Sequence, residues 1–199
     1  MMALSIASPA FGAACSTFAN LQALLTAGTC DIGSVTFSGF TYNNSIAASA
    51  VNLTAAGTGV AGSFAGLALS TSGGFTTPFS LTYSVACVSC TFIGSQVNAN
   101  IQPVFPAATM SLTYVDNGGT LTATATGQDQ SHVLGGTGTS VSNVLNSGGS
   151  GDRLQSLQNN FYITPAGGGG APEPTSLLLF GSGFLAVGLA ARARRKARS

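Results

Sequence analysis

Charged side chains are scarce in this sequence. Only 6% of its 199 residues are Asp, Glu, Lys or Arg, and five of the six cations lie after residue 191. Residues 1–191 contain one arginine and five acidic residues, which is a net charge of −4. Such a surface has no basic stripe that could neutralise phosphates, so we expect no nucleic-acid partner. The hydrophobic content of 45% is nevertheless enough for the core of one domain.

Tryptophan is absent, so a platform that stacks sugar rings would have to use tyrosine. Most of the tyrosines occupy positions that resemble strand residues packed in a core. The composition therefore does not demand a sugar ligand. The four tyrosines are Tyr42, Tyr83, Tyr114 and Tyr162.

Histidine occurs once, at His132, with Asp129 and Ser131 close by in the sequence. A Ser-His-Asp site needs these groups brought together by a fold, and neighbours in one loop usually point apart. We therefore interpret Gly127–His132 as a solvated polar loop.

Carboxylates are also few. A glycosidase pair would have to come from Asp31, Asp116, Asp129 and Asp152, because Glu173 lies in a linker. Asp31 and Asp116 lie in expected turns, and the segment that begins at Asp116 reads Asp-Asn-Gly-Gly, which predicts a tight hairpin. A calcium loop would need more than one carboxylate. We expect no catalytic residue, no metal site and no cofactor, and hence no enzyme.

A long apolar run occurs at residues 175–191, with 17 uncharged residues. As a helix it would be about 25 Å long, just enough to cross a hydrocarbon core of about 30 Å. A basic tail follows and should stay in the cytoplasm, which leaves everything upstream on the other side of the membrane. The alternative is a buried globular helix, which would carry a polar face. The cations of the tail are Arg192, Arg194, Arg195, Lys196 and Arg198.

A Pro-Glu-Pro triplet, Pro172, Glu173 and Pro174, precedes this run and is itself preceded by a Gly-rich linker at residues 165–171. The two prolines hold the triplet in an extended shape that a processing enzyme can bind. Triplet, apolar span and Arg-rich end, in this order at residues 172–199, resemble the PEP-CTERM sorting signal of Gram-negative bacteria. The resemblance implies an exosortase as partner, a membrane-tethered intermediate and a final place in the cell envelope, at the cell surface or outside the cell. It also implies an association with extracellular polysaccharide and biofilm.

Four cysteines form an even set, and an exported chain favours disulfides. Cys15 with Cys30 and Cys87 with Cys90 is the pairing nearest in sequence, although three connectivities are possible. Two alternatives are a redox centre at Cys87 and Cys90, which would need a cation to lower a thiol pKa, and zinc bound by all four cysteines.

Residues 1–14 indicate the end of a signal peptide, although the basic start is missing. A lipoprotein site at Cys15 is the weaker alternative, because the expected leucine is missing. A short helix is predicted at residues 16–27, with Ser16 or Thr17 as its cap and Gly28 as its end. The order of helix, cysteine and the segment 30–42 resembles the start of many PEP-CTERM ectodomains, which adds no activity.

Alternation of apolar and polar residues predicts eight or nine strands without intervening helices. The fold class is therefore all-β, an antiparallel sandwich or jelly roll over residues 15–164, with bulges at Gly39 and Gly66 where the phase changes. The runs cover residues 34–42, 51–55, 64–69, 79–87, 93–101, 110–114, 121–125, 141–145 and 161–164.

The expected function is that of an exported, non-catalytic surface or extracellular-matrix protein that an exosortase processes. The alternative is a β-sandwich module that binds polysaccharide or another protein. An enzyme is the third possibility. It would lose its obvious candidates if no two of Asp116, Asp129, Asp152 and His132 lay within about 9 Å of each other.

Overall fold

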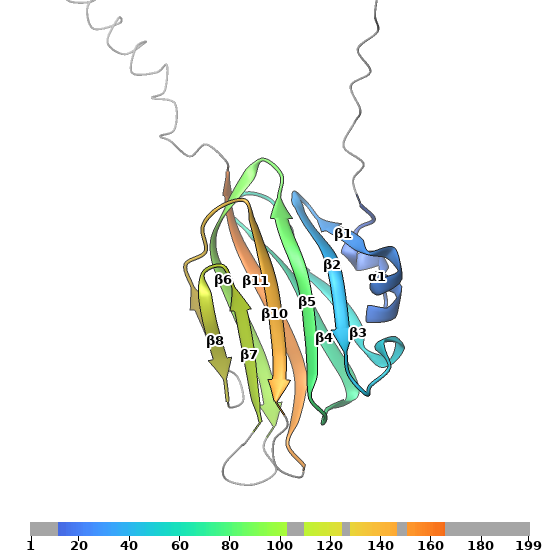
Figure 1. The fold of residues 1–199 in the computed structure, drawn as a ribbon. Coiled ribbons are helices and arrows are strands. Elements are labelled where there is room, and N and C mark those ends of the chain that lie inside the picture. Colours follow the sequence, from blue (N-terminus) through green and yellow to red (C-terminus); the bar gives the residue numbers. More distant parts are fainter. Residues whose placement is uncertain (1–11, 103–109, 125–127, 147–150, 166–199) are drawn as a thin grey trace, which may run out of the picture. The chain divides into compact units, whose positions relative to one another are not determined.

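A computed structural model describes residues 12–102, 110–124, 128–146 and 151–165 of the chain. Within residues 1–166, the described strands form two antiparallel sheets that pack face to face (Figure 1). This arrangement confirms the expected antiparallel β-sandwich.

The first sheet has six strands. In spatial order they are β1 (Thr29–Ile32), β2 (Val35–Asn43), β5 (Phe79–Cys87), β10 (Gly138–Asn146), β7 (Ser111–Asp116) and β8 (Gly119–Ala123). The second sheet has five strands. In spatial order they are β3 (Asn52–Gly57), β4 (Phe64–Phe75), β11 (Arg153–Pro165), β6 (Cys90–Gln102) and β9 (Gln128–His132).

Two of these strands, β1 and β9, were not predicted from the alternation pattern. β1 has only four residues, and β9 consists entirely of polar residues. Each is held by pairing along a longer neighbour, β1 with β2 and β9 with β6. The expectation that Gln128–His132 is a solvated loop is therefore wrong, because tertiary pairing overrides a weak local pattern.

The N-terminal helix is shorter than predicted. The segment divides into a 3₁₀ turn, η1 (Cys15–Thr17), and the helix α1 (Leu21–Ala27); a second turn, η2 (Ala48–Ala50), precedes β3. Asn20 is the N-cap of α1, not Ser16 or Thr17, and its side chain accepts from the Ala23 N–H at 2.9 Å. Gly28 ends α1 with φ +75°, as expected.

Of the two predicted bulges, only the one at Gly39 is confirmed. The pairing of β2 with β5 shifts register between Ser38 and Thr41. At Gly66 the ladders of β4 with β3 and β11 continue without a shift. Gly66 instead leaves room for its cross-strand neighbour Asn160, since a Cβ at Gly66 would lie 2.3 Å from Asn160 Oδ1.

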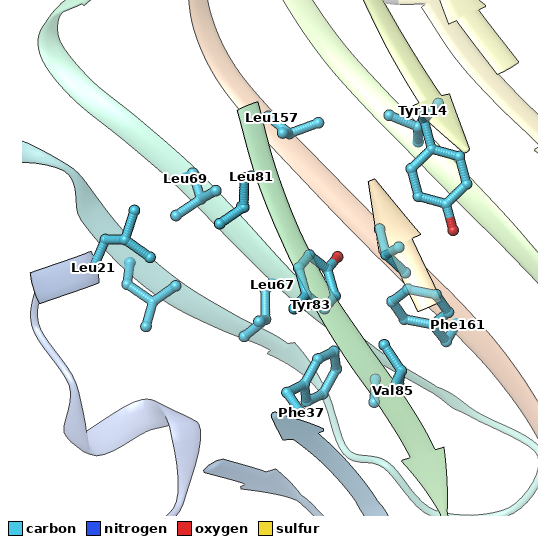
Figure 2. Close-up of a cluster of buried hydrophobic side chains, with 14 of the residues drawn as sticks. Leu21, Phe37, Leu67, Leu69, Leu81, Tyr83, Val85, Tyr114, Leu157 and Phe161 are labelled. Atoms are coloured by element: carbon cyan, nitrogen blue, oxygen red, sulfur yellow. The ribbon is translucent and has the colours of Figure 1, made fainter. Parts of the chain in front are cut away.

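The core lies between the inner faces of the two sheets, which Figure 2 shows around Tyr83. Phe37 of β2 and Phe161 of β11 meet edge to face across the layers, with ring centroids 6.0 Å apart. Leu21 of α1 also belongs to this core, so the helix covers one open side of the sandwich. Because most apolar side chains are used here, polar side chains predominate on the outer faces, with Ile93, Val115 and Val144 as exposed exceptions.

No described helix is long and apolar enough to cross a membrane. The predicted transmembrane helix at residues 175–191 lies outside the described residues. The same holds for the Pro-Glu-Pro triplet, the basic tail, residues 1–11 of the predicted signal peptide and most of the linker.

Candidate functional site

Asp116 and His132, 16 residues apart, meet at one side of the sandwich. Nε2 of His132 lies 2.6 Å from Oδ1 of Asp116. Asp116 is the last residue of β7 in the first sheet, and His132 is the last residue of β9 in the second. The contact therefore joins the two sheets. The distance between Asp116 and His132 is also well below the limit of about 9 Å that was set for candidate acid/base pairs.

The Asp116 carboxylate is enclosed by donors. Tyr114 donates its hydroxyl proton to Oδ2 at 2.6 Å, and the Gly118 N–H donates to Oδ1 at 2.7 Å. Burial by itself would raise the pKa of Asp116, but hydrogen bonding by Ser95, Tyr114, Gly118 and His132 outweighs it and lowers the pKa below its ordinary value. The carboxylate is thus held ionised.

The hairpin between β7 and β8 allows His132 to come this close. Asp116 pairs with Gly119 across a two-residue turn, which confirms the predicted hairpin. A Cβ at Gly118 would lie 2.6 Å from the Val133 carbonyl oxygen and 2.7 Å from His132 Nε2. Gly118 is therefore needed for the close approach of His132. From the sequence alone, this glycine was explained by the turn.

Gln130 completes the same contact between the sheets. Its side-chain amide donates to the Thr122 carbonyl oxygen at 2.6 Å and accepts from the Thr122 N–H at 3.0 Å. Gln130 therefore satisfies backbone groups on the outer edge of β8 from its place on β9. Together with the pair of Asp116 and His132, it makes this side of the sandwich a polar clamp.

The clamp lacks the groups that an acyl-transfer site needs. Ser131, the hydroxyl nearest to His132 in sequence, pairs with Gln96, whereas His132 pairs with Ser95, so Ser131 and His132 occupy opposite faces of β9. The Ser95 side chain is fully buried, and its contribution to the site is to lower the pKa of Asp116. Packing therefore closes the Ser95 hydroxyl to a substrate, whereas Ser131 is exposed but faces away from His132.

The other predicted carboxylates belong to residues of β1 and β9 and to the residue just before β11. Asp31 lies in β1, not in a turn, and accepts from the Thr36 hydroxyl at 2.7 Å. Asp152 is buried just before β11, and Asp129 pairs in register with Asn98. In the described part of the chain, no three His, Cys, Asp or Glu side chains gather where they could hold a metal ion.

The four cysteines form two disulfides, Cys15 with Cys30 and Cys87 with Cys90. The first ties η1 to β1, and the second closes the turn between β5 and β6. The hydroxyl oxygen of Ser34 lies 3.3 Å from Cys90 Sγ. With all four sulfurs used in this way, the structure leaves no thiolates for the zinc site that was considered from sequence.

Two of the four tyrosines, Tyr83 and Tyr114, are buried in the core, as their strand positions suggested. Tyr42 is half-buried beside Phe79. Tyr162 is half-buried on the outer face of the second sheet, where its ring centroid lies 5.8 Å from that of Phe64. Tyr162 therefore belongs to a sheet surface that a ligand could reach.

The outer face of the second sheet is dominated by side-chain amides. They alternate with inward-facing residues along β6 and β11, and we call them, together with Tyr162, the amide row. Its members are Gln96, Asn98, Asn100, Gln158, Asn160 and Tyr162. Asn160 is buried, with 6% of its surface exposed, and the other members are half-buried. The sequence alone did not reveal it, because only the pairing of β6 with β11 places the two sets side by side.

The outer face of the first sheet is instead rich in hydroxyl groups and contains a shallow hollow of about 330 Å³. Val115 of β7 and Asn117, which follows β7, line one side of the hollow. Gly39 of β2 lines the opposite side. The hydroxyl-bearing residues that line the hollow are Thr82, Ser84, Ser140 and Ser142.

Residues 171–196 match the model of the PEP-CTERM protein-sorting motif. The chain carries a PEP-CTERM sorting signal. The matched segment includes Pro172, Glu173 and Pro174, the predicted span and the cations up to Lys196, while Arg198 lies beyond it. The motif supports an exported PEP-CTERM protein that an exosortase sorts.

No curated protein matches this PEP-CTERM protein. Among solved structures, TmCBM61 in complex with β-1,4-galactotriose is similar, with a TM-score of 0.30 and 13% identity over 64% of this chain and 89% of that one. A family two carbohydrate esterase from Cellvibrio japonicus has a TM-score of 0.27 and 14% identity over 58% of this chain and 36% of that one. The enzymatically active domain of tailspike protein 4 from bacteriophage CBA120 has a TM-score of 0.28 and 10% identity over 68% and 20%. At these scores the likenesses carry no argument about function.

Proposed function

We propose that this PEP-CTERM protein is a non-catalytic component of the cell surface or extracellular matrix, delivered there by exosortase processing. The sorting motif at residues 171–196, behind a β-sandwich, is the observation that carries the proposal. In this view the C-terminal segment tethers the exported domain to the inner membrane, with its arginines in the cytoplasm, until the exosortase acts at the Pro-Glu-Pro triplet.

The geometry of the clamp supports a non-catalytic role. Asp116 has a fully buried side chain whose oxygens already accept from Tyr114, Gly118 and His132. A general base must be able to reach the proton it removes, and a carboxylate with this many donors is a weak base. The contact between Asp116 and His132 is better suited to holding two sheets together.

Sorting can be tested with the full-length protein in a host that has an exosortase. Replacing Pro172, Glu173 and Pro174 with alanine should keep the protein in the membrane fraction, because the enzyme loses the motif that it recognises. Pro165→Ala, an exposed proline outside the motif, is the matched control and should be released like the wild type. Equal release of the triple variant and the control would refute the proposal.

A second candidate function is a module that binds polysaccharide or another protein at the surface. The specific observation in its favour is the amide row, which presents hydrogen-bonding groups that the fold does not use up. A polymer-binding module and a matrix component are compatible, since binding would retain the released protein in the matrix.

A further inference from the structure

We propose that the amide row on β6 and β11 is a binding site for an uncharged polysaccharide chain that lies along the strands. This inference rests on the second candidate function above and names its site and ligand class.

Placement follows from the register of the two strands. Asn98 pairs with Gln158 and Gln96 pairs with Asn160, so four amides form two adjacent cross-strand rows on one face. Asn100 extends the face in one direction, and Tyr162, opposite Gly94, extends it in the other. From Gly94 to Asn100 the face is about 20 Å long, which suits an elongated ligand with several sugar units.

Orientation is set by hydrogen bonds within the row. The Tyr162 hydroxyl and the Asn160 amide both donate to Gln96 Oε1, at 2.8 and 3.2 Å. The Gln158 amide donates to Asn160 Oδ1 at 2.8 Å. The two bonds to Gln96 Oε1 use both lone pairs of that oxygen. The side-chain NH₂ group of Gln96 and the side-chain oxygen of Gln158 are therefore held in fixed directions and remain available to a ligand.

Two members of the row have unused hydrogen-bonding capacity. Within the described structure, no protein group hydrogen-bonds to the side chains of Asn98 or Asn100. Neither side chain has a buried polar atom without a partner, so both amides can be reached from solvent. Each amide offers two donors and one acceptor, and each sugar hydroxyl is both a donor and an acceptor. The row therefore matches a ligand that presents hydroxyl groups at regular intervals.

The aromatic end of the row supplies an apolar surface. Tyr162 and Phe64 lie next to each other on β11 and β4, in register, with their ring centroids 5.8 Å apart. The neighbouring positions on β4 are Gly66 and Ala68, which are too small to obstruct a ligand that lies across the rings. The C–H face of a sugar ring can pack on such a surface.

Charge decides between ligand classes. The row carries no charged side chain, Asp129 is in register with Asn98, and residues 1–191 have a net charge of −4. An anionic polymer would be repelled, whereas a neutral one would not. A protein partner needs large apolar or Arg anchors, and in the described strands of the second sheet only Ile93 is a large exposed apolar residue.

Affinity electrophoresis of the full chain in detergent, in gels containing a single polymer, tests this inference. The neutral probes are dextran, mixed-linkage β-glucan, galactomannan and arabinoxylan, and the acidic probes are alginate and polygalacturonate. We expect at least one neutral probe, and neither acidic one, to retard the protein. Retardation by no neutral probe, or a stronger effect of an acidic one, would overturn the inference.

Variants locate the site. Asn98→Ala with Asn100→Ala removes two unpaired amides and should weaken the retardation about tenfold or more at unchanged thermal stability. The matched control is Ser84→Ala with Ser140→Ala, two exposed positions beside the hollow of the first sheet, which should bind like the wild type. The reverse pattern would place the site in the hollow, and equal binding by both double variants would place it elsewhere. Either result would overturn the inference but leave a polysaccharide-binding module standing, and neither bears on sorting.

Discussion

Asn159 of β11 donates its side-chain amide to the Tyr83 hydroxyl oxygen of β5 across the interior of the sandwich, at 2.7 Å. The same amide donates to Asn143 Oδ1 of β10 at 3.0 Å. Three polar side chains from both sheets thus meet within an apolar core. A one-residue slip of β11 would turn Asn159 outward, so this contact favours a single register.

The first prediction concerns this buried trio. Asn159→Ala should lower the free energy of unfolding by about 2–4 kcal/mol, because it leaves Tyr83 and Asn143 without their shared donor and opens a small cavity. Urea denaturation measures the change. Tyr83→Phe should cost less, and a double-mutant cycle should show coupling between the two sites. Additive effects would mean that the hydrogen bond contributes nothing.

The second prediction concerns the pH dependence of the clamp. The pKa of Asp116 is lowered in the folded state, so the unfolded chain binds a proton at a higher pH than the folded one. The stabilisation is then fully present above the unfolded pKa of about 4 and is lost as the pH falls through the folded value. Asp116→Asn should flatten the stability profile between about pH 5 and pH 2.

Urea midpoints at a series of pH values check this behaviour. Ser131→Ala, at an exposed position one residue before His132, is the control and should follow the wild-type profile. If the Asp116→Asn variant kept the full acid dependence of the wild type, another carboxylate would have to be its source.

The third prediction concerns two glycines of β4. Gly66→Ala should destabilise the protein by about 1–3 kcal/mol, because the new Cβ would lie 2.3 Å from Asn160 Oδ1 and 2.6 Å from the Asn159 carbonyl oxygen. Gly73→Ala is matched to it, since nothing lies within 4 Å of a Cβ there. Thermal melting of both variants should separate them by several degrees, and identical melting temperatures would contradict the close approach.

The fourth prediction concerns the disulfides. Peptide mapping of the mature protein should recover Cys15 linked to Cys30 and Cys87 linked to Cys90. Replacing both Cys15 and Cys30 with alanine should cost about 3 kcal/mol of stability, because a loop of about 15 residues is released in the unfolded state. The pair Cys87 and Cys90 closes a much shorter loop, so its removal should cost less. A free Cys30 in the mature chain would show that processing removes Cys15.

Local patterns determined much of this protein in advance. The sorting signal could be identified from a linear order of residues, since the Pro-Glu-Pro triplet, the apolar run and the basic residues follow one another in the sequence. Alternation in Phe79–Cys87 and the hairpin after Asp116 also depend on near neighbours, and both are present in the structure. The bulge at Gly39 was also predicted from near neighbours in the sequence, and it too is present in the structure.

Only the tertiary structure decided which distant residues meet. The polar segment Gln128–His132 becomes a strand because β6 offers it a pairing edge, and this pairing brings His132 to Asp116. Likewise, the sequence around Gly66 predicts a bulge, whereas in the structure Gly66 makes room for Asn160 on the neighbouring strand. A sequence with period-two alternation shows which residues share a face of one strand, but the order and register of strands are set by contacts across the whole chain. The amide row exists for that reason.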